Sequence, residues 1–502
     1  MLFNSLQFAI FFIIVYILYL FLTHRQQNWL LLLASCIFYA AWDWKFLLLI
    51  FISITTDYYC SLKIHASDDH KARNRFLILS VLVNLSILGF FKYFNFFASN
   101  IKALLGYFGF SVHPILLHIV LPLGISFYTF RTMSYTFDVY TDKIKPTRSY
   151  PDYALFVSFF PLLIAGPIMR AKDLLPQIAS PRKLRLDSFY EGCYLVFWGL
   201  FQKVFIADNL AKIVDPVFNA GPPYSGAGVL VGIYAFTFQI YCDFAGYSNM
   251  ARGLGKYMGF DIIINFNLPY FATNPQDFWN RWHISLSTWL RDYIYTPVAF
   301  SKRYWGKWGM VFALMVTFVF CGLWHGAAWT FVLWGAYQGI LFAAYKLLQP
   351  LLLRIPEPKD VAQKKLWFFV RVLLFFHLTC LGWLIFRSHS AAQVLEMLRS
   401  VLFNPHLVPT IGLKFASLKI MFSLSIFIII ELMLFWKDDL KVAMNHNKLV
   451  VKITNLFKEL WDFLKVRKRY WLIPFIAFLL LLILLIISMG PISTQPFIYS
   501  QF

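Results

Sequence analysis

The sequence predicts an all-α membrane protein, a bundle of helices that cross a lipid bilayer, and three observations lead to this class. Hydrophobic residues make up 60% of the 502 positions and charged residues only 14%, whereas soluble domains carry about 25% charged residues. The mean hydropathy is +0.63. Apolar runs of about 20 residues, the length of a membrane-spanning helix, recur along the chain. This composition excludes a soluble globular enzyme, a disordered chain, a collagen-like chain and a coiled coil.

The apolar runs predict 10 to 12 crossings within a single membrane-embedded domain that covers residues 1–502. The first run, 6–22, has no basic residue before it and no small-residue cleavage pattern after it, so it is expected to be a retained span rather than a signal peptide. Two shorter stretches that carry Pro and Gly, 101–118 and 153–168, are expected to be re-entrant or interfacial pieces buried within protein. The further long runs are 29–41, 46–62, 76–97, 120–138, 190–206, 228–245, 309–345 (a double pass), 369–386, 415–436 and 471–489.

The placement of the basic residues predicts the orientation of the chain. The net charge is +21, and Lys and Arg gather in short loops at 63–75, 170–185 and 437–469. Such loops face the cytoplasm, and counting spans from them puts both termini on the outer side. Because the charge is spread over short inter-span loops, we expect a lipid bilayer and no nucleic acid as the surroundings of this chain.

The six cysteines predict neither a disulfide framework nor a metal site. They lie in or beside apolar segments, and none forms a Cys-x-x-Cys pair. We interpret them as free thiols that pack as small hydrophobic side chains. No His-Glu-x-x-His or Gly-x-Ser-x-Gly motif occurs in the sequence.

The segment 274–295 is a first candidate for chemistry. At helical spacing its large apolar residues fall on one stripe, and His283 falls beside a polar row formed by Gln276, Asn280, Ser287 and Arg291. The segment is too polar to span a membrane and is typical of an interfacial helix. His283 is therefore either a functional residue or a hydrogen-bonded packing residue.

The run 308–345 is a stronger candidate, because it contains no charged residue and is bracketed by Lys307 and Lys346. Both lysines are expected on the cytoplasmic side, so the run must cross outward and return. Each leg then has about 19 residues and measures roughly 28 Å, slightly less than a hydrocarbon core of about 30 Å. The tip, which contains His325 between Gly322 and Gly326, should lie below the outer surface. A histidine held at depth indicates a functional site and suits a general base, although it could simply bond a backbone carbonyl.

Two buried acids and the C-terminal tail complete the candidates. Asp243 and Asp138 each end a predicted span and could orient a histidine, or else cap a helix or pair with a basic residue. The apolar and aromatic tail, 490–502, follows the last predicted span and is expected outside the membrane. An extended chain covers at most about 3.6 Å per residue, so Tyr499 could reach back into an outward cavity. Its phenol would need a base such as His325 to become a nucleophile, and a plain interfacial anchor is the alternative.

At these residues the chain resembles the membrane-bound O-acyltransferase family, and most closely the branch typified by the alginate O-acetylation protein and its peptidoglycan-acetylating relatives. The resemblance covers most of the chain, and the last two of its motifs are specific in combination. The motifs are Trp42-Asp-Trp-Lys45, Pro122-Leu-Gly-Ile-Ser-Phe-Tyr-Thr-Phe130, Ala165-Gly-Pro-Ile168, Asp243-Phe-Ala-Gly-Tyr247, residues 274–295 and Gly322-Leu-Trp-His-Gly326.

The resemblance implies a ring of helices around a thinned centre, with a cytoplasmic donor tunnel, an outward funnel and a catalytic core at about 120–350. It implies two functional histidines, His283 and an invariant catalytic one at His325. It also implies a tyrosine near the C-terminus, Tyr499, that carries the acyl group as an ester. Ser500 departs from the family pattern, which has an aromatic residue there, and Asn249 stands where an acid is common. The residues expected to line the donor or substrate path are Asn280, Arg291, Trp324, Asp243 and Ser287.

The function that this resemblance implies is an O-acyltransferase of a bacterial inner membrane. An acyl thioester, expected to be acetyl-CoA, docks from the cytoplasm, and no permanently bound cofactor or metal is expected. The acyl group crosses the membrane and passes to a separate extracytoplasmic transferase that esterifies a polysaccharide, which spares the cell from moving a charged coenzyme through hydrocarbon. Two alternatives stay open: D-alanyl transfer to teichoic acid, and a polysaccharide-export component without chemistry.

Overall fold

The computed structural model describes residues 1–111, 116–117, 119–354, 356, 358, 360–404 and 418–436, with side chains from 424 in the last range. Helices and their connecting loops account for these residues, and none of them forms a strand, which confirms the all-α class. The basic loop at 437–469, the last predicted span and the tail with Tyr499 lie outside the described residues.

The described chain divides into two compact units. Residues within 1–200 and 244–398 form the first unit, and those within 201–243 and 399–436 belong to the second. The single domain over 1–502 and its core at about 120–350 stay predictions. The helices up to residue 200 are α1 (Leu6–Phe21), α2 (His24–Asp43), α3 (Phe46–Ala66), α4 (His70–Leu88), the π-helix η1 (Gly89–Tyr93), α5 (Phe94–Tyr107), α6 (Ile125–Tyr140), α7 (Tyr150–Ser158), α8 (Phe160–Leu163), α9 (Ala171–Ala179) and α10 (Leu186–Leu200).

The rest of the chain continues as helices with short irregular connections. They are the π-helix η2 (Phe201–Ala207), α11 (Asp208–Phe218), α12 (Gly226–Tyr257), the 3₁₀ turn η3 (Pro269–Phe271), α13 (Pro275–Arg281), α14 (Ile284–Leu290), the π-helix η4 (Arg291–Tyr295), α15 (Thr296–Ser301), the 3₁₀ turn η5 (Arg303–Trp305), α16 (Lys307–His325), α17 (Trp329–Leu352), α18 (Val361–Arg387), α19 (Ala391–Phe403) and α21 (Leu418–Phe435).

Six of the described helical segments are long and apolar enough to cross a membrane. They are α3, the continuous segment His70–Tyr107, α12, α16, α17 and α18. The predicted double pass at 309–345 is confirmed as the pair α16 and α17, which turn back on each other at residues 326–328. The count of 10 to 12 crossings and the thinned centre with its funnel stay predictions.

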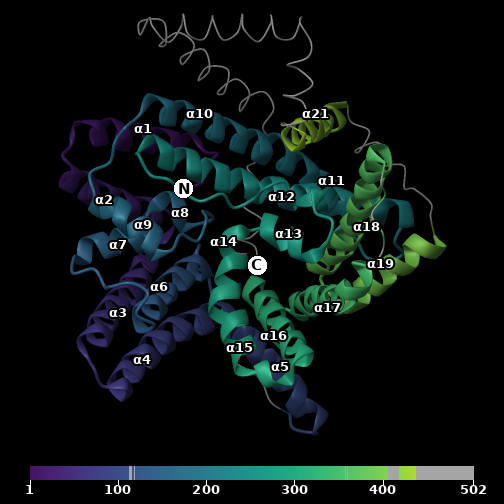
Figure 1. Ribbon diagram of the computed structural model, residues 1–502, viewed down its shortest axis with the longest axis horizontal. Coiled ribbons are helices and arrows are strands. Elements are labelled where there is room, and N and C mark those ends of the chain that lie inside the picture. The colour runs from purple at the N-terminus through teal and green to yellow at the C-terminus, as the bar shows by residue number, and fades with distance from the viewer. Residues whose placement is uncertain are drawn as a thin grey trace, which may run out of the picture. The chain divides into compact units, whose positions relative to one another are not determined.

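A hydrogen-bonded cluster of buried polar side chains connects α3, α4 and α6. Figure 1 shows these three helices grouped in one part of the first unit. The buried carboxylate of Asp57 accepts from Ser80 Oγ at 2.6 Å and from Asn84 Nδ2 at 2.9 Å. Thr132 of α6 donates to Asn84 Oδ1 at 3.2 Å. Hydrogen bonds of this kind hold helices together where the surroundings are as apolar as the side chains.

The stretch 153–168, predicted to be buried within protein, is buried throughout. The same prediction is wrong for the described part of the other stretch, because residues 101–111 are exposed at nearly every position. The stretch 153–168 consists of the short helices α7 and α8, whose C-terminal carbonyls need partners from elsewhere. The guanidinium of Arg131 supplies them from α6, donating to Val157 O at 2.7 Å and to Leu162 O at 2.9 Å. A buried cation thus replaces the hydrogen bonds that the broken helix lacks.

All six cysteines are free, as the sequence predicts. Four are buried and two are half-buried, which fits their interpretation as small packing residues. Among the described residues no group of three or more His, Cys, Asp or Glu side chains is arranged to hold a metal ion.

Candidate functional site

The turn between α16 and α17 is the centre of the candidate site. The leg α16 has 19 residues and ends at His325 itself. A side chain at Gly322 would collide with the backbone carbonyl of Phe331, and one at Gly335 with that of Phe318. The two helices therefore touch backbone to backbone near the tip, which confirms that Gly322 permits close approach.

The imidazole of His325 is held among aromatic rings and is only 5% exposed. Its ring centroid lies 4.8 Å from Trp324, 5.0 Å from Trp334 of α17 and 5.3 Å from Phe386 of α18, each in an edge-to-face arrangement. Three helices thus contribute to the packing of this one side chain. His325 is therefore buried at the end of the hairpin, and the position of this tip below the outer membrane surface stays a prediction.

The predicted continuous helix over 274–295 is wrong, because the chain breaks at Trp282 and His283. Trp282 is extended, and His283 has a left-handed backbone with φ of 43°. The break turns His283 away from the polar row that helical spacing would give it. The imidazole is fully buried, whereas Asn280 and Arg291 are exposed.

The cause of the break is Asn265, which lies in the irregular segment after α12. Its carbonyl oxygen accepts the backbone N–H of Ile284 at 2.9 Å, and its side-chain Oδ1 accepts that of Ser285 at 3.1 Å. These N–H groups begin helix α14 and have no partners inside it. Asn265 in turn donates to Ser248 Oγ at 3.2 Å, so the turn is anchored to α12. Sequence reasoning missed Asn265 and Ser285, since nothing in their spacing connects them with His283.

The same amide fixes the tautomer of His283. Because Asn265 Oδ1 accepts from a backbone N–H, it must be the oxygen, and so His283 Nδ1 at 3.2 Å must be the donor. Burial lowers the pKa of His283 to about 3, so the imidazole is neutral and Nε2 carries the lone pair. That Nε2 is buried and has no hydrogen-bond partner in the part of the chain that the structure describes. An unpaired buried acceptor of this kind is typical of a functional site.

Trp324 brings the two histidines together. Its ring centroid lies 6.2 Å from that of His283 and 4.8 Å from that of His325. On its other side it stacks on Phe130 of α6 at 5.3 Å. The indole Nε1 is buried without a hydrogen-bond partner among the described residues. Two imidazoles and an indole donor therefore share one apolar compartment.

Three of the other predicted lining residues have hydrogen-bond or ion-pair partners other than the two histidines. Arg291 donates from Nε to Asp292 at 2.9 Å, and the Ser287 hydroxyl donates to the carbonyl of Trp282 at 3.0 Å. Asp243 belongs to the second unit, where it pairs with Lys203 at 2.5 Å. Lys203 also binds Asp208 at 2.8 Å, and all three side chains are at most 2% exposed. For Asp243 the alternative of pairing with a basic residue is confirmed.

Asp138, the other acid at the end of a predicted span, is likewise paired. It accepts from the phenol of Tyr293 at 2.8 Å and lies 4.0 Å from Lys143. The guanidinium of Arg170 covers the face of the same Tyr293 ring at 4.4 Å. Asp138 thus ties the end of α6 to the π-helix η4, and neither histidine is among these partners.

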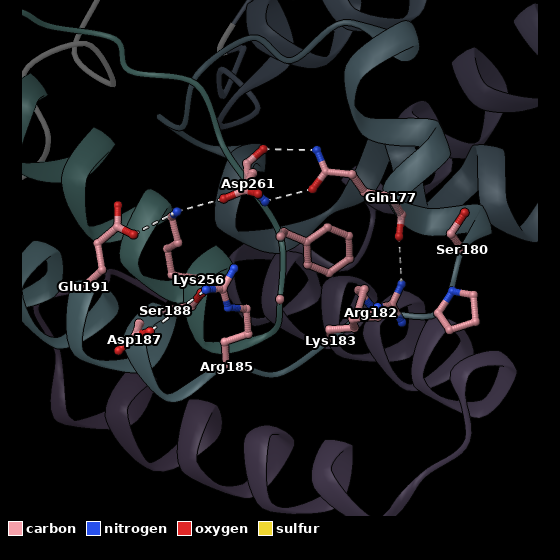
Figure 2. A pocket seen from close by; sticks show the side chains of 13 residues that line it. Gln177, Ser180, Arg182, Lys183, Arg185, Asp187, Ser188, Glu191, Lys256 and Asp261 are labelled. Carbon is pink, nitrogen blue, oxygen red and sulfur yellow. Dashed lines mark hydrogen bonds and ion pairs between the residues drawn. The ribbon is translucent and has the colours of Figure 1, made fainter. Parts of the chain in front are cut away.

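A polar hollow of about 680 Å³ lies between the α9–α10 loop and the end of α12 (Figure 2). Lys256 bridges Glu191 at 2.9 Å and Asp261 at 2.7 Å across it. Gln177 forms two hydrogen bonds with the backbone of Asp261. Figure 2 shows these side chains directed toward one another. The lining holds four basic and three acidic residues in all.

The fold and site together define a helical membrane protein with a buried pair of histidines. Residues 71–386 match the model of the membrane-bound O-acyltransferase family. The chain is 42% identical over 397 residues to the probable alginate O-acetylase AlgI of Azotobacter vinelandii, covering 78% of this chain and 76% of the relative. It is 35% identical over 400 residues to the peptidoglycan O-acetyltransferase of Helicobacter pylori, covering 74% and 73%. The chain belongs to the membrane-bound O-acyltransferase family and is a multi-pass membrane O-acyltransferase.

Two further matches concern parts of the chain. A teichoic acid D-alanyltransferase of Bacillus subtilis is 29% identical over 271 residues, covering 53% of this chain and 68% of the relative. Residues 454–502 match a second family model, a family of unknown function (DUF5989). This second match includes the tail with Tyr499.

Proposed function

We propose that this enzyme transfers an acetyl group from a cytoplasmic thioester, acetyl-CoA, across the inner membrane for the O-acetylation of a polysaccharide. The observation that carries the proposal is the placement of His283 and His325 against the same Trp324. The relatives named as O-acetylating enzymes match three quarters of the chain at 35–42% identity, whereas the D-alanyltransferase matches half of it at 29%. The acceptor is accordingly a surface or secreted polymer of the alginate or peptidoglycan kind.

The chemistry follows from the bases in the compartment. His325 takes the proton of an attacking hydroxyl, whose oxygen then bonds to the thioester carbonyl carbon. The C–S bond breaks, and the proton passes to the leaving thiolate, so that an ester and a thiol result. We place His283 Nε2 and the Trp324 indole on the path of the donor, with the exposed Asn280 and Arg291 and the half-buried Ser287 toward its entrance.

We further propose that Tyr499 provides the attacking hydroxyl and then hands the acetyl group to an extracytoplasmic transferase. A tyrosyl ester formed within reach of His325 would let the acyl group emerge outside while the coenzyme stays in the cytoplasm. The relay requires the C-terminus on the outer side, as the positive-inside pattern predicts. The separate transferase would complete esterification of the polymer.

The test is the ester content of the surface polysaccharide in a strain that depends on this gene. His325→Ala should abolish O-acetylation, because the base is lost. The abundance of the protein in the membrane should stay normal, because the aromatic side chains around His325 still pack against one another. Unchanged ester content in that strain would refute the proposed function. Tyr499→Phe tests the relay separately: full activity would remove the tyrosyl ester but leave the role of His325 intact. Mass spectrometry of the C-terminal peptide should show an increase of one acetyl group in the wild type alone.

A further inference from the structure

Lys92 lies in an unusual place for a lysine, within the apolar segment His70–Tyr107. It is half-buried in the π-helical turn η1, between α4 and α5. Among the described residues no carboxylate lies within 4 Å of its ammonium group. A cation at such a position is costly unless something else compensates its charge.

The end of α16 provides that compensation. Lys92 Nζ donates to the carbonyl of Trp324 at 2.6 Å and to that of His325 at 3.0 Å. The next residue, Tyr93, donates from its phenol to the carbonyl of Leu323 at 2.7 Å. The preceding carbonyl, that of Gly322, accepts the N–H of Gly326. The last carbonyls of a helix have no partners within it, and here Lys92 and Tyr93 satisfy the final three.

The electrostatics of this contact favour a charged donor. The C-terminus of a helix carries the equivalent of about half a negative charge, and hydrogen bonds from an ammonium group are roughly twice as strong as neutral ones. The ammonium group also lies 6.0 Å from the centre of the Trp324 ring. The ammonium group therefore contacts both the backbone and the side chain of Trp324, the residue that packs against the two histidines.

We propose that Lys92 is a positioning residue of the acyl-transfer site: its ammonium group caps α16 and holds the last turn, with Trp324 and His325, in the geometry that the reaction needs. This inference rests on the proposed function in that it takes His325 as the base. The carbonyl that Lys92 binds belongs to His325 itself, so any fraying of this turn moves the imidazole directly. The π-helical turn fits the role, since such turns are frequent at functional sites.

The first test compares Lys92→Met and Lys92→Arg in membrane vesicles supplied with radiolabelled acetyl-CoA. Lys92→Met keeps the length of the side chain but removes the donor and the charge. We expect kcat to fall by about 100-fold, the cost of misplacing a reacting group by roughly 1 Å, with KM for acetyl-CoA little changed. Lys92→Arg should recover part of this loss. Lys102→Met, which changes an exposed lysine of α5, is the matched control and should behave as wild type.

The second test does not depend on activity. Diethylpyrocarbonate modifies accessible imidazoles, and mass spectrometry locates the product. His325, 5% exposed in the capped helix, should react at least tenfold faster in Lys92→Met, while the exposed His70 reacts at the same rate in both proteins. Tyr93→Phe removes one hydrogen bond and no charge, so the rate at which His325 is modified should increase less than in Lys92→Met. This variant also provides the test if Lys92→Met does not fold.

The outcomes separate the two proposals. Wild-type kcat in Lys92→Met overturns the positioning role, and so does a loss of kcat in which His325 stays as protected as in the wild type. If the wild-type protein transfers no acetyl group, the proposed function fails, yet the protection experiment still decides whether Lys92 holds His325.

Discussion

The backbone of His283 constrains what can replace it. A left-handed conformation costs an L-residue with a Cβ about 1–2 kcal/mol, and here the strain is held by the hydrogen bonds that Asn265 makes to the following turn. Strain of this kind is maintained where a side chain must point in a direction that regular structure would not allow. A bulky or β-branched side chain at this position would be the worst fit.

Two variants of His283 should therefore distinguish the role of this residue in folding from its role in acetyl transfer. His283→Gly fits the left-handed backbone without strain but leaves a cavity where the buried imidazole was, so we expect a normal gel-filtration profile, a moderately lower Tm and no acetyl transfer. His283→Val should instead lower the yield of folded protein, because it combines the strained backbone with a β-branched side chain. Wild-type transfer by His283→Gly would show that the imidazole has no part in the reaction.

The element scale shows which parts of the site could be predicted from the sequence. The α16–α17 hairpin could, because a charge-free run between Lys307 and Lys346 leaves a membrane chain only one path, out and back. The break between α13 and α14 could not, because its cause is a hydrogen-bonding partner 18 residues away, Asn265. Periodicity describes one segment at a time, whereas this turn is formed by two.

The lysine at position 92 illustrates an intermediate case. Its position in an apolar run is visible in the sequence and marks it as unusual. Its partners are carbonyl groups, however, and a carbonyl is present at every residue, so no pattern of side chains could indicate that the end of α16 accepts its hydrogen bonds. The same holds for Arg131 and the carbonyl of Val157 in the last turn of α7.

Close contact of α16 with α17 leads to a prediction for the hairpin as an element. In Gly322→Ala the added methyl group meets the carbonyl of Phe331, and overpacking of this kind costs about 1–3 kcal/mol. We expect a lower Tm and at least tenfold slower acetyl transfer, since Trp334 of α17 would move away from His325. Gly106→Ala, at a helical glycine of α5 with open space around it, is the control and should change neither. Unaltered activity in Gly322→Ala would mean that the site tolerates separation of the two helices.

At the scale of the whole molecule, the distribution of charge predicts the direction of the proposed transfer. The chain carries 45 basic and 24 acidic residues, and the basic loops at 63–75 and 170–185 are predicted to face the cytoplasm. One predicted span, 190–206, separates the second of these loops from the connection between α11 and α12, which should therefore lie outside. The proposed entry of the donor from the cytoplasm and the proposed release of the acyl group outside both depend on this orientation.

Single cysteines at two exposed loop positions test the orientation directly. Asp68→Cys lies between α3 and α4, and Gly221→Cys between α11 and α12, and both positions are exposed. A membrane-impermeant maleimide should label Gly221→Cys in spheroplasts and Asp68→Cys only in inverted vesicles, with the wild type, whose six cysteines are buried or half-buried, giving the background. If both cysteines react from the same side, an odd number of crossings between them is excluded. If the sides are reversed, the tail with Tyr499 would face the cytoplasm, and a tyrosyl ester could not deliver its acetyl group to a transferase outside.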